Sequence, residues 1–374
     1  MVRIFAFITL LTITAIWLLD NHSQVELEHE FKVGDILGGI PDTGFQRALA
    51  PRRFIFPDDH GPHPAFRNEW WYFTGNLTDT ESNRFGFQLV FFRNALSPKN
   101  PERTSAWGSN QTWMAHLALT NVSGKKFYSF ERFSRGAKEL AGAEAKPFQV
   151  WLYDWSITES NGHWHLHAKA DNIGLNLKLK PIRQPLLQGQ DGLSQKSNEP
   201  GNASYYYSIP RLAAGGEIKL DNKIHQVTGL SWLDREWSTS ALGENQAGWD
   251  WFSLQLSDGS DLMFYRLRRK DGTADPHSSG TLLRKDGEII RLNADAVQLQ
   301  ELEWWDSPAG GSYPIQWKLV IPEQDIELTV SPALKNQELN LLIRYWEGAV
   351  YVSGKKSGKQ LEGHGYLELA GYAK

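Results

Sequence analysis

Apolar and polar side chains alternate along most of the chain after Trp70, and no later window sustains the repeat of an amphipathic helix. Turn-forming pairs interrupt this alternation at intervals typical of hairpins. Asp258-Gly259, Asp271-Gly272 and Asp286-Gly287 follow one another in the second half, and Asn161-Gly162 separates two strand-like segments in the first. The sequence therefore predicts an all-β, antiparallel protein with little helix apart from its N-terminal segment.

Two segments depart from the alternation. Residues 134–145 are rich in alanine, which favours helix, but Gly136 and Gly142 limit the prediction to a short helical turn. Residues 181–203 are polar and contain three prolines and three glycines. Because this second segment has few apolar groups to bury, we expect it to form a long surface loop.

Length and composition limit the number of domains and the kinds of partner that this chain can have. A chain of 374 residues suits two domains of common size. The net charge is -4 and the charges are mixed along the chain, so nucleic acid is not an expected partner. Cysteine is absent, which excludes disulfides, thiolate metal sites and a cysteine nucleophile. The common signatures of serine hydrolases, zinc hydrolases and nucleotide-binding loops are also missing. We therefore expect no metal and no cofactor.

The N-terminus has the charge order of an export segment. Residues 4–19 form an uncharged apolar run that Arg3 precedes and Asp20 follows. The run is short for a membrane span, and no small-residue cleavage triplet follows closely. We expect residues 1–23 to be either a signal peptide or an uncleaved anchor in contact with the membrane, and residues 24–50 to be a tether. The body of the protein is then periplasmic or otherwise extracytoplasmic.

The stretch from Phe56 to Leu77, FPDDHGPHPAFRNEWWYFTGNL, combines histidines, acids and aromatic rings. It opens as a turn around His60 and ends as a strand in which Glu69 and Trp71 share a face. One interpretation puts His60 and Glu69 at the polar end of an aromatic pocket, with the imidazole acting as acid or base near neutral pH. Alternatively, the histidine only caps backbone groups of the turn.

Residues 231–237 are predicted to form a strand with Asp234 and Glu236 on one face and Arg235 and Trp237 on the other. The two carboxyl groups then lie about 7 Å apart. In a low-dielectric interior, burial and mutual repulsion raise the pKa of one acid, which could then protonate an alkene or polarise a carbonyl. Alternatively, both acids accept hydrogen bonds from turn amides and arginines and tie two domains together.

These two stretches resemble signatures of the carotenoid 1,2-hydratase and AttH-like family. Gly248-Trp249-Asp250-Trp251-Phe252, Trp346-Glu347-Gly348 and the final Gly371-Tyr372 resemble its later landmarks. Members of this family are bacterial proteins with two lipocalin-like domains, and fungal decalin-forming pericyclases are distantly similar to them. The resemblance implies two tandem lipocalin-like, calycin-type antiparallel β-barrels, which we expect in residues 51–238 and 239–374.

The resemblance also implies a function. The AttH-like branch is associated with ABC transporters, so we expect an exported protein that binds a lipid, isoprenoid or polyketide-like molecule and serves a membrane ABC-transport system. The alternative is a cofactor-free hydratase, isomerase or cyclase that uses carboxylic general acid catalysis. Carotenoid hydratases carry a histidine at the position of Arg235 and an acid two residues beyond the position of Tyr265, and this chain has neither. Hydration of a carotenoid is therefore not expected. A third interpretation is a docking domain without a small ligand.

Further histidines and aromatic residues complete the candidate set. His116 shares a predicted strand face with Met114 and is expected to reach the same pocket as His60. The alternating histidines in residues 163–167 are expected to face water rather than a metal, because the residues between them form an apolar face. We predict as catalytic residues Asp234, Glu236, Glu69 and His60, and as ligand-binding residues Trp70, Trp71, His116, Arg235, Trp237, Trp249 and Tyr265.

Overall fold

The computed structural model describes residues 43–99, 105–240 and 242–373. The predicted export segment and most of the predicted tether lie outside these residues. Phe45 and Ala48, at the end of the predicted tether, are buried against the body of the protein. Within the described ranges, no helix is long and apolar enough to cross a membrane.

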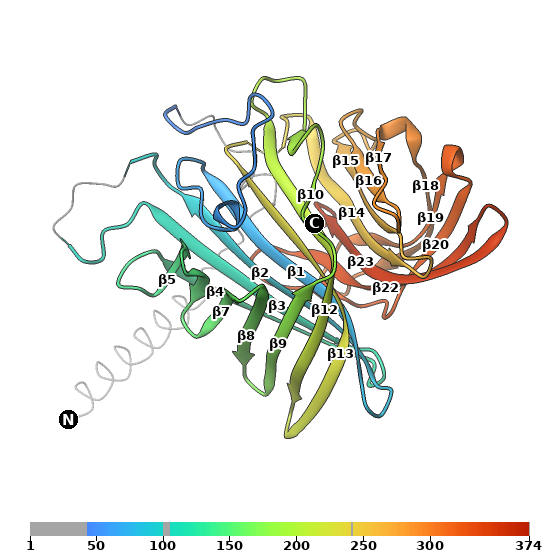
Figure 1. Ribbon diagram of the computed structural model, residues 1–374, viewed down its shortest axis with the longest axis horizontal. Helices are drawn as coiled ribbons and strands as arrows, with labels where there is room; N and C mark the ends of the chain where they lie inside the picture. The colour runs from blue at the N-terminus through green and yellow to red at the C-terminus, as the bar shows by residue number, and fades with distance from the viewer. Residues whose placement is uncertain (1–42, 100–104, 241, 374) are drawn as a thin grey trace, which may run out of the picture. The chain divides into compact units, whose positions relative to one another are not determined.

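The first antiparallel sheet contains thirteen strands in the order β4-β3-β2-β1-β13-β12-β9-β8-β7-β6-β5, with β10 and β11 paired to β12 (Figure 1). Its strands are β1 (Asn68–Asp79), β2 (Arg84–Ala95), β3 (Gln111–Asn121), β4 (Lys126–Arg135), β5 (Ala141–Ala145), β6 (Phe148–Leu152), β7 (Trp155–Ser160), β8 (His163–Ala170), β9 (Ile173–Pro181), β10 (Leu186–Leu187), β11 (Leu193–Gln195), β12 (Ala203–Leu220) and β13 (Lys223–Ser238).

The second antiparallel sheet contains ten strands in the order β17-β16-β15-β14-β23-β22-β20-β19-β18, with β21 paired to β22. Its strands are β14 (Gln246–Leu256), β15 (Asp261–Arg269), β16 (Ser279–Leu283), β17 (Ile289–Leu292), β18 (Gln298–Asp306), β19 (Ser312–Ile321), β20 (Ile326–Pro332), β21 (Glu338–Leu339), β22 (Tyr345–Lys356) and β23 (Lys359–Ala370). The helical turns of the described residues are three 3₁₀ segments, η1 (Asp58–His60), η2 (Ala294–Ala296) and η3 (Pro322–Gln324).

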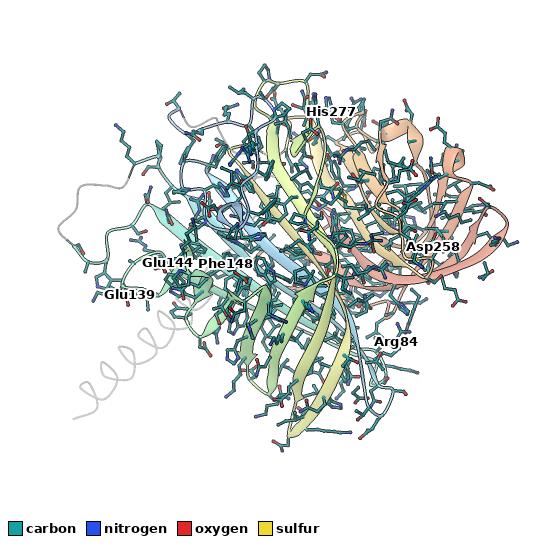
Figure 2. The ribbon with its side chains drawn as sticks, in the orientation of Figure 1. Arg84, Glu139, Glu144, Phe148, Asp258 and His277 are labelled. Atoms are coloured by element: carbon teal, nitrogen blue, oxygen red, sulfur yellow. The ribbon has the colours of Figure 1, made fainter. Side chains whose placement is uncertain are left out.

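The predicted hairpin turns are confirmed. Asp258-Gly259 connects β14 to β15, and Asp286-Gly287 connects β16 to β17. Asn161 and Gly162 both have positive φ between β7 and β8, which is the two-residue geometry that matches the twist of a hairpin. The all-β prediction is confirmed as well: each sheet curls around its own apolar core, as in a lipocalin-like barrel. Figure 2 shows side chains along both sheets, among them the buried ring of Phe148 in the first core.

The predicted helical turn in residues 134–145 is wrong. The chain leaves β4 after Arg135 and returns as β5, which pairs with β6. Lys138 and Glu139 have positive φ angles of 48° and 57°. Such a left-handed conformation cannot continue a right-handed helix, and Ala141, Ala143 and Ala145 enter strand β5 instead.

The prediction of a surface loop for residues 181–203 is wrong in part. β10 and β11 pair with β12, and Gln188 is fully buried. The amide of Gln188 donates to Ser208 Oγ at 2.9 Å and accepts from Thr281 Oγ1 at 2.7 Å. Polar groups that find partners in both sheets can be buried at little cost, so the low apolar content of this segment did not keep it at the surface.

The two sheets pack against each other through one face each, which we call the intersheet face. On the first sheet this face is formed by β1, β2, β3, β12 and β13, and on the second by β14, β15, β22 and β23. A mixed aromatic cluster fills it. The residues of this cluster are Tyr72, Val90, Tyr206, Trp232, Leu242, Trp251, Met263, Tyr265, Leu267, Ala349 and Tyr366.

Candidate active site between the two sheets

Strand β13 has two buried faces, because one lies in the first core and the other on the intersheet face. Leu233 and Trp237 belong to the first core, with Arg235 on the same side. Asp234 and Glu236 point the opposite way, toward the second sheet. The alternation predicted from the sequence is therefore correct.

Asp234 is a buried acid held by three donors. The hydroxyls of Tyr206 and Ser208 donate to its two oxygens, and Trp232 Nε1 donates to Oδ1 at 2.7 Å. Burial raises the pKa of Asp234 to about 7; the three hydrogen bonds act against this rise, while the neighbouring charge of Glu236 adds to it. Near neutral pH a large fraction of this carboxyl group is therefore protonated.

Glu236 lies beside a buried ammonium group. Lys196 Nζ is 3.3 Å from Glu236 Oε1, and Ser204 also donates to that carboxylate. Burial by itself lowers the pKa of Lys196, but Glu236 and Tyr265 outweigh it and the pKa is raised, so the ammonium stays charged. Lys196 Nζ also lies 4.1 Å from the ring centre of Tyr265. One strand thus presents a protonated acid and an ion-paired carboxylate two residues apart.

The second sheet contributes two more acids to the same face. Glu347 on β22 pairs directly with Glu368 on β23. Burial raises the pKa of Glu347 well above its usual range, and Glu368 raises it further. Burial raises the pKa of Glu368 to about 8 against a hydrogen bond from Trp249, and the charges of the first-sheet acids add to that rise. We call Asp234, Glu236, Glu347 and Glu368 the acid cluster.

A hydrogen-bonded chain extends from the acid cluster along the first sheet. Tyr72 donates to Glu347 Oε1, and Gln88 Nε2 donates to Glu347 Oε2 at 2.8 Å. Gln88 Nε2 also donates to the hydroxyl of Tyr345 at 3.0 Å, and that hydroxyl lies 2.8 Å from His116 Nδ1. Burial lowers the pKa of His116 to about 3, so this imidazole is neutral.

Glu69 lies in a separate ion-pair network inside the first sheet. It pairs with Arg93 through Oε1 and with Arg235 Nη2 at 2.6 Å through Oε2. The backbone amide of His63 also donates to both carboxylate oxygens. Burial alone would raise the pKa of Glu69, but Arg93 and Arg235 hold it well below its usual range. Glu69 is therefore ionised and cannot act as a general acid near neutral pH.

His60 and His63 belong to this interior network too. His60 Nδ1 lies 2.6 Å from the hydroxyl of Tyr207. Burial and the charge of Arg235 lower the pKa of His60 to about 4. The ring of His63 stacks on Trp237 with a centroid separation of 3.7 Å. These imidazoles fix the entry of the chain into β1 rather than facing the acid cluster.

The structure thus divides the predicted site residues between two faces. The prediction that His116 reaches the same pocket as His60 is wrong. The ring of His60 packs against Phe148 and Trp164 of the first core, whereas His116 Nδ1 lies 2.8 Å from the hydroxyl of Tyr345 on the second sheet. The intersheet face receives Asp234, Glu236, Trp70, His116, Trp249 and Tyr265, whereas the first core receives His60, Glu69, Trp71, Arg235 and Trp237.

Part of the intersheet face remains accessible. Trp70, Phe92 and Met114 are half-buried, and the register places them in one row across β1, β2 and β3. On the second sheet, Trp249 and Glu368 are also half-buried. Apolar surface beside partly protonated acids is the arrangement expected of a site that binds a lipophilic molecule and exchanges a proton with it.

Sequence reasoning missed several residues of the site. Lys196 falls in the segment predicted to be a surface loop, and Tyr206 lies in an aromatic strand without a distinctive motif. Glu347 stands out in the sequence only as part of a family landmark, and Glu368 belongs to no motif. The available signal was an acid inside an otherwise apolar strand, such as Leu367-Glu368-Leu369.

The fold and the site together define a protein with two lipocalin-like sheets and buried carboxylic acids between them. The chain belongs to the AttH-like family, whose model matches residues 47–372. The crystal structure of a protein assigned as AttH from Nitrosomonas europaea covers 87% of this chain and 100% of that one, with 34% identity and a TM-score of 0.78.

Two relatives carry names that describe a reaction. The dehydratase asqC of Emericella nidulans is 23% identical over 312 residues, which cover 71% of this chain and 86% of that protein. The crystal structure of kievitone hydratase from Nectria haematococca has a TM-score of 0.67 over 89% of this chain and 98% of that one. At 15% identity, this second likeness is one of fold.

Proposed function

We propose that this protein is a lyase that adds water to, or removes water from, a hydrophobic substrate held on the intersheet face. The proposal rests on two acids that lie two residues apart on one face of β13. The pKa of Asp234 is raised to about 7, and Glu236 is ion-paired to Lys196. Addition of water needs one group that gives a proton and one that takes a proton. The naming of relatives as a dehydratase and a hydratase supports this reaction class.

In the direction of hydration, protonated Asp234 donates its proton to one alkene carbon of the substrate. Water adds through its oxygen to the neighbouring carbon, and Glu236 accepts the proton that this water loses. The proton then returns to Asp234, so that the net change is the addition of one water molecule. Dehydration is the same sequence in reverse, with Asp234 taking its proton back from carbon.

The surroundings of Asp234 suit this role. Tyr206, Ser208 and Trp232 hold the carboxyl group in one orientation, so that little reorganisation is needed when its charge changes. Lys196 holds Glu236 in place and compensates its charge. The negative charge of Glu236 opposes ionisation of Asp234 and helps to keep it protonated.

A labelling experiment tests the proposal on a mixture of candidate substrates. Wild-type protein and the variant Asp234→Asn are incubated with a lipid extract of the host in heavy-oxygen water, and products are analysed by mass spectrometry. We expect the wild type to form a product that has gained labelled water, or one that has lost water, and Asp234→Asn to form neither. Asp271→Asn, in an exposed turn, serves as the control and retains the activity.

Native mass spectrometry of the same proteins separates the alternatives. A resident ligand in both wild type and Asp234→Asn, without any product, would identify a carrier such as one that serves a membrane transport system. Neither ligand nor product would instead favour a docking domain. Either result would reject the proposed lyase activity.

A further inference from the structure

The far end of the hydrogen-bonded chain holds two polar atoms without a protein partner. His116 Nε2 and Gln88 Oε1 are both buried, and neither has a hydrogen-bond partner among the described residues. The side chains are fully or almost fully buried, at 0% and 1% exposure. A buried donor or acceptor without a partner destabilises the folded state, so such atoms point to a ligand group that satisfies them.

The hydrogen-bond pattern fixes what these two atoms offer. The hydroxyl of Tyr345 accepts from Gln88 Nε2, and among the described residues His116 Nδ1 is the neighbour that can accept the proton of this hydroxyl. We therefore assign to the neutral imidazole of His116 the tautomer that carries its proton on Nε2, since this tautomer gives the Tyr345 proton an acceptor. The site therefore presents one N–H donor, on His116, and one carbonyl acceptor, on Gln88. A neutral hydroxyl group matches both, since it accepts one hydrogen bond and donates another.

The strand register gives the distance from this pair to the proposed acid. Asp234 pairs with Tyr72, Tyr72 with Val90, and Val90 with His116, so Asp234 and His116 lie in one row across four strands. At the usual spacing between strands, they are about 14 Å apart. Water that reacts at Asp234 must be in contact with the reacting carbon, so a hydroxyl at His116 belongs to a different part of the substrate.

An apolar path connects the two ends. The adjacent row of the same face contains Glu236, Trp70, Phe92 and Met114, paired in that order across the strands. The last three are half-buried and therefore accessible from outside the core. The ring of Phe92 packs against His116 with centroids 5.6 Å apart. A hydrocarbon body on these three side chains would place one end at the acids and the other at His116.

We propose that His116 and Gln88 form a hydroxyl-binding subsite, which selects hydrophobic substrates that carry a neutral hydroxyl group at the end remote from the carbon where water adds. This inference rests on the proposed function, because it requires the substrate to lie on the intersheet face. It adds the substrate class: an elongated lipophilic alcohol rather than a hydrocarbon or a carboxylic acid.

A pair of matched probes tests the subsite. Dodecanol and dodecyl methyl ether share an apolar chain, and both can accept a hydrogen bond from His116, but only the alcohol can donate one to Gln88. Binding is measured by titrating the tryptophan fluorescence of the full-length protein. We expect the alcohol to bind the wild type about tenfold more tightly than the ether, which corresponds to one buried hydrogen bond.

Variants of the two subsite residues test which side chain produces the preference for the alcohol over the ether. Gln88→Met should bind both probes equally, and His116→Phe, which keeps an aromatic ring beside Phe92, should bind both about tenfold more weakly than the wild type does. His165→Phe, a histidine on β8 away from the intersheet face, should match the wild type. Thermal unfolding of each variant shows whether it is folded, and Gln88→Met tests the subsite even if His116→Phe fails to fold.

Three results would overturn the subsite: equal affinities of the two probes for the wild type, no binding of either probe, or a crystal structure of the dodecanol complex in which a water molecule occupies the position between His116 and Gln88. The last result would assign the hydroxyl to water rather than to substrate. Binding of either probe requires no turnover, so this titration is read independently of whether Asp234→Asn abolishes product formation. Failure of the acid chemistry is thereby distinguished from failure of the subsite.

Discussion

Glu347 and Glu368 lie directly opposite each other on β22 and β23, with both side chains on the intersheet face. Two carboxylates in this position repel each other, and burial disfavours the charged form of each. The pair therefore keeps at least one proton near neutral pH. Asp234 and Glu236 face this pair from the first sheet, and their charges raise the pKa of Glu368 further.

The first prediction concerns stability against pH. Glu368 has its pKa raised to about 8 in the folded protein, whereas an unfolded glutamate titrates near pH ~4.3. The folded state then holds a proton that the unfolded state has lost, so this contribution to stability is complete below about pH 4 and disappears as the pH rises through 8. We expect Glu368→Gln to show a smaller fall of the melting temperature between pH 5 and pH 9 than the wild type, measured by calorimetry. Glu362→Gln, exposed on the same strand, should behave as the wild type; equal pH dependence of all three proteins would contradict the prediction.

The second prediction concerns the pH dependence of activity. If protonated Asp234 is the general acid, kcat/KM should fall as the pH rises above about 7, the raised pKa of this residue. Tyr206→Phe removes a hydrogen bond that lowers this pKa, so the fall should move to higher pH. Tyr205→Phe changes the adjacent residue on the opposite face and should leave the profile unchanged. A profile that does not move in Tyr206→Phe would remove Asp234 from the role of acid.

The third prediction is that Glu69 contributes to stability and not to catalysis. Glu69→Gln leaves the buried guanidinium groups of Arg93 and Arg235 without their carboxylate. Removing one partner of a buried ion pair typically costs about 3–5 kcal/mol, so we expect a large loss of unfolding free energy in urea titrations. Turnover per folded molecule should remain. Glu81 forms an exposed ion pair with Lys223, and Glu81→Gln should therefore change stability little. Lost turnover in a fully stable Glu69→Gln protein would show that Glu69 has a catalytic role after all.

The fourth prediction contrasts two tryptophans. Trp237 is fully buried in the first core, whereas Trp249 is half-buried on the intersheet face. Trp237→Ala should therefore lower the free energy of unfolding by about 3–5 kcal/mol. Trp249→Ala should instead weaken dodecanol binding with a smaller loss of stability. Isothermal calorimetry and urea unfolding of both variants measure the two effects, and a reversed pattern would place the ligand inside the first sheet.

The sequence predicted the strands, the hairpins and the two faces of β13, because those depend on local alternation and turn chemistry. It could not predict which face of β1 or β3 meets the second sheet. Glu69 and Trp70 are neighbours in one signature, yet Glu69 lies in the first core and Trp70 on the intersheet face. Both faces of these strands are apolar enough to be buried, so the pattern alone does not distinguish them.

The acid cluster was only half predictable for a different reason. Asp234 and Glu236 are close in sequence, so strand periodicity places them together. Glu347 and Glu368 reach them only through the packing of one sheet on the other, and a single sequence carries no record of that contact. Lys196 was missed because its polar segment was expected to face solvent, whereas the ammonium is buried beside Glu236.

Both faces of β13 are buried, so its register cannot shift without moving side chains between two buried environments. Deletion of a single residue before Trp232 would turn every following side chain to the other side of the sheet. Arg235 would then occupy the present position of Asp234 in the acid cluster, and Glu236 would occupy the position of Arg235 next to Glu69. The acid cluster and the ion-pair network of Glu69 would thus exchange residues. We expect this deletion to abolish both folding and activity, although many surface strands tolerate such a change.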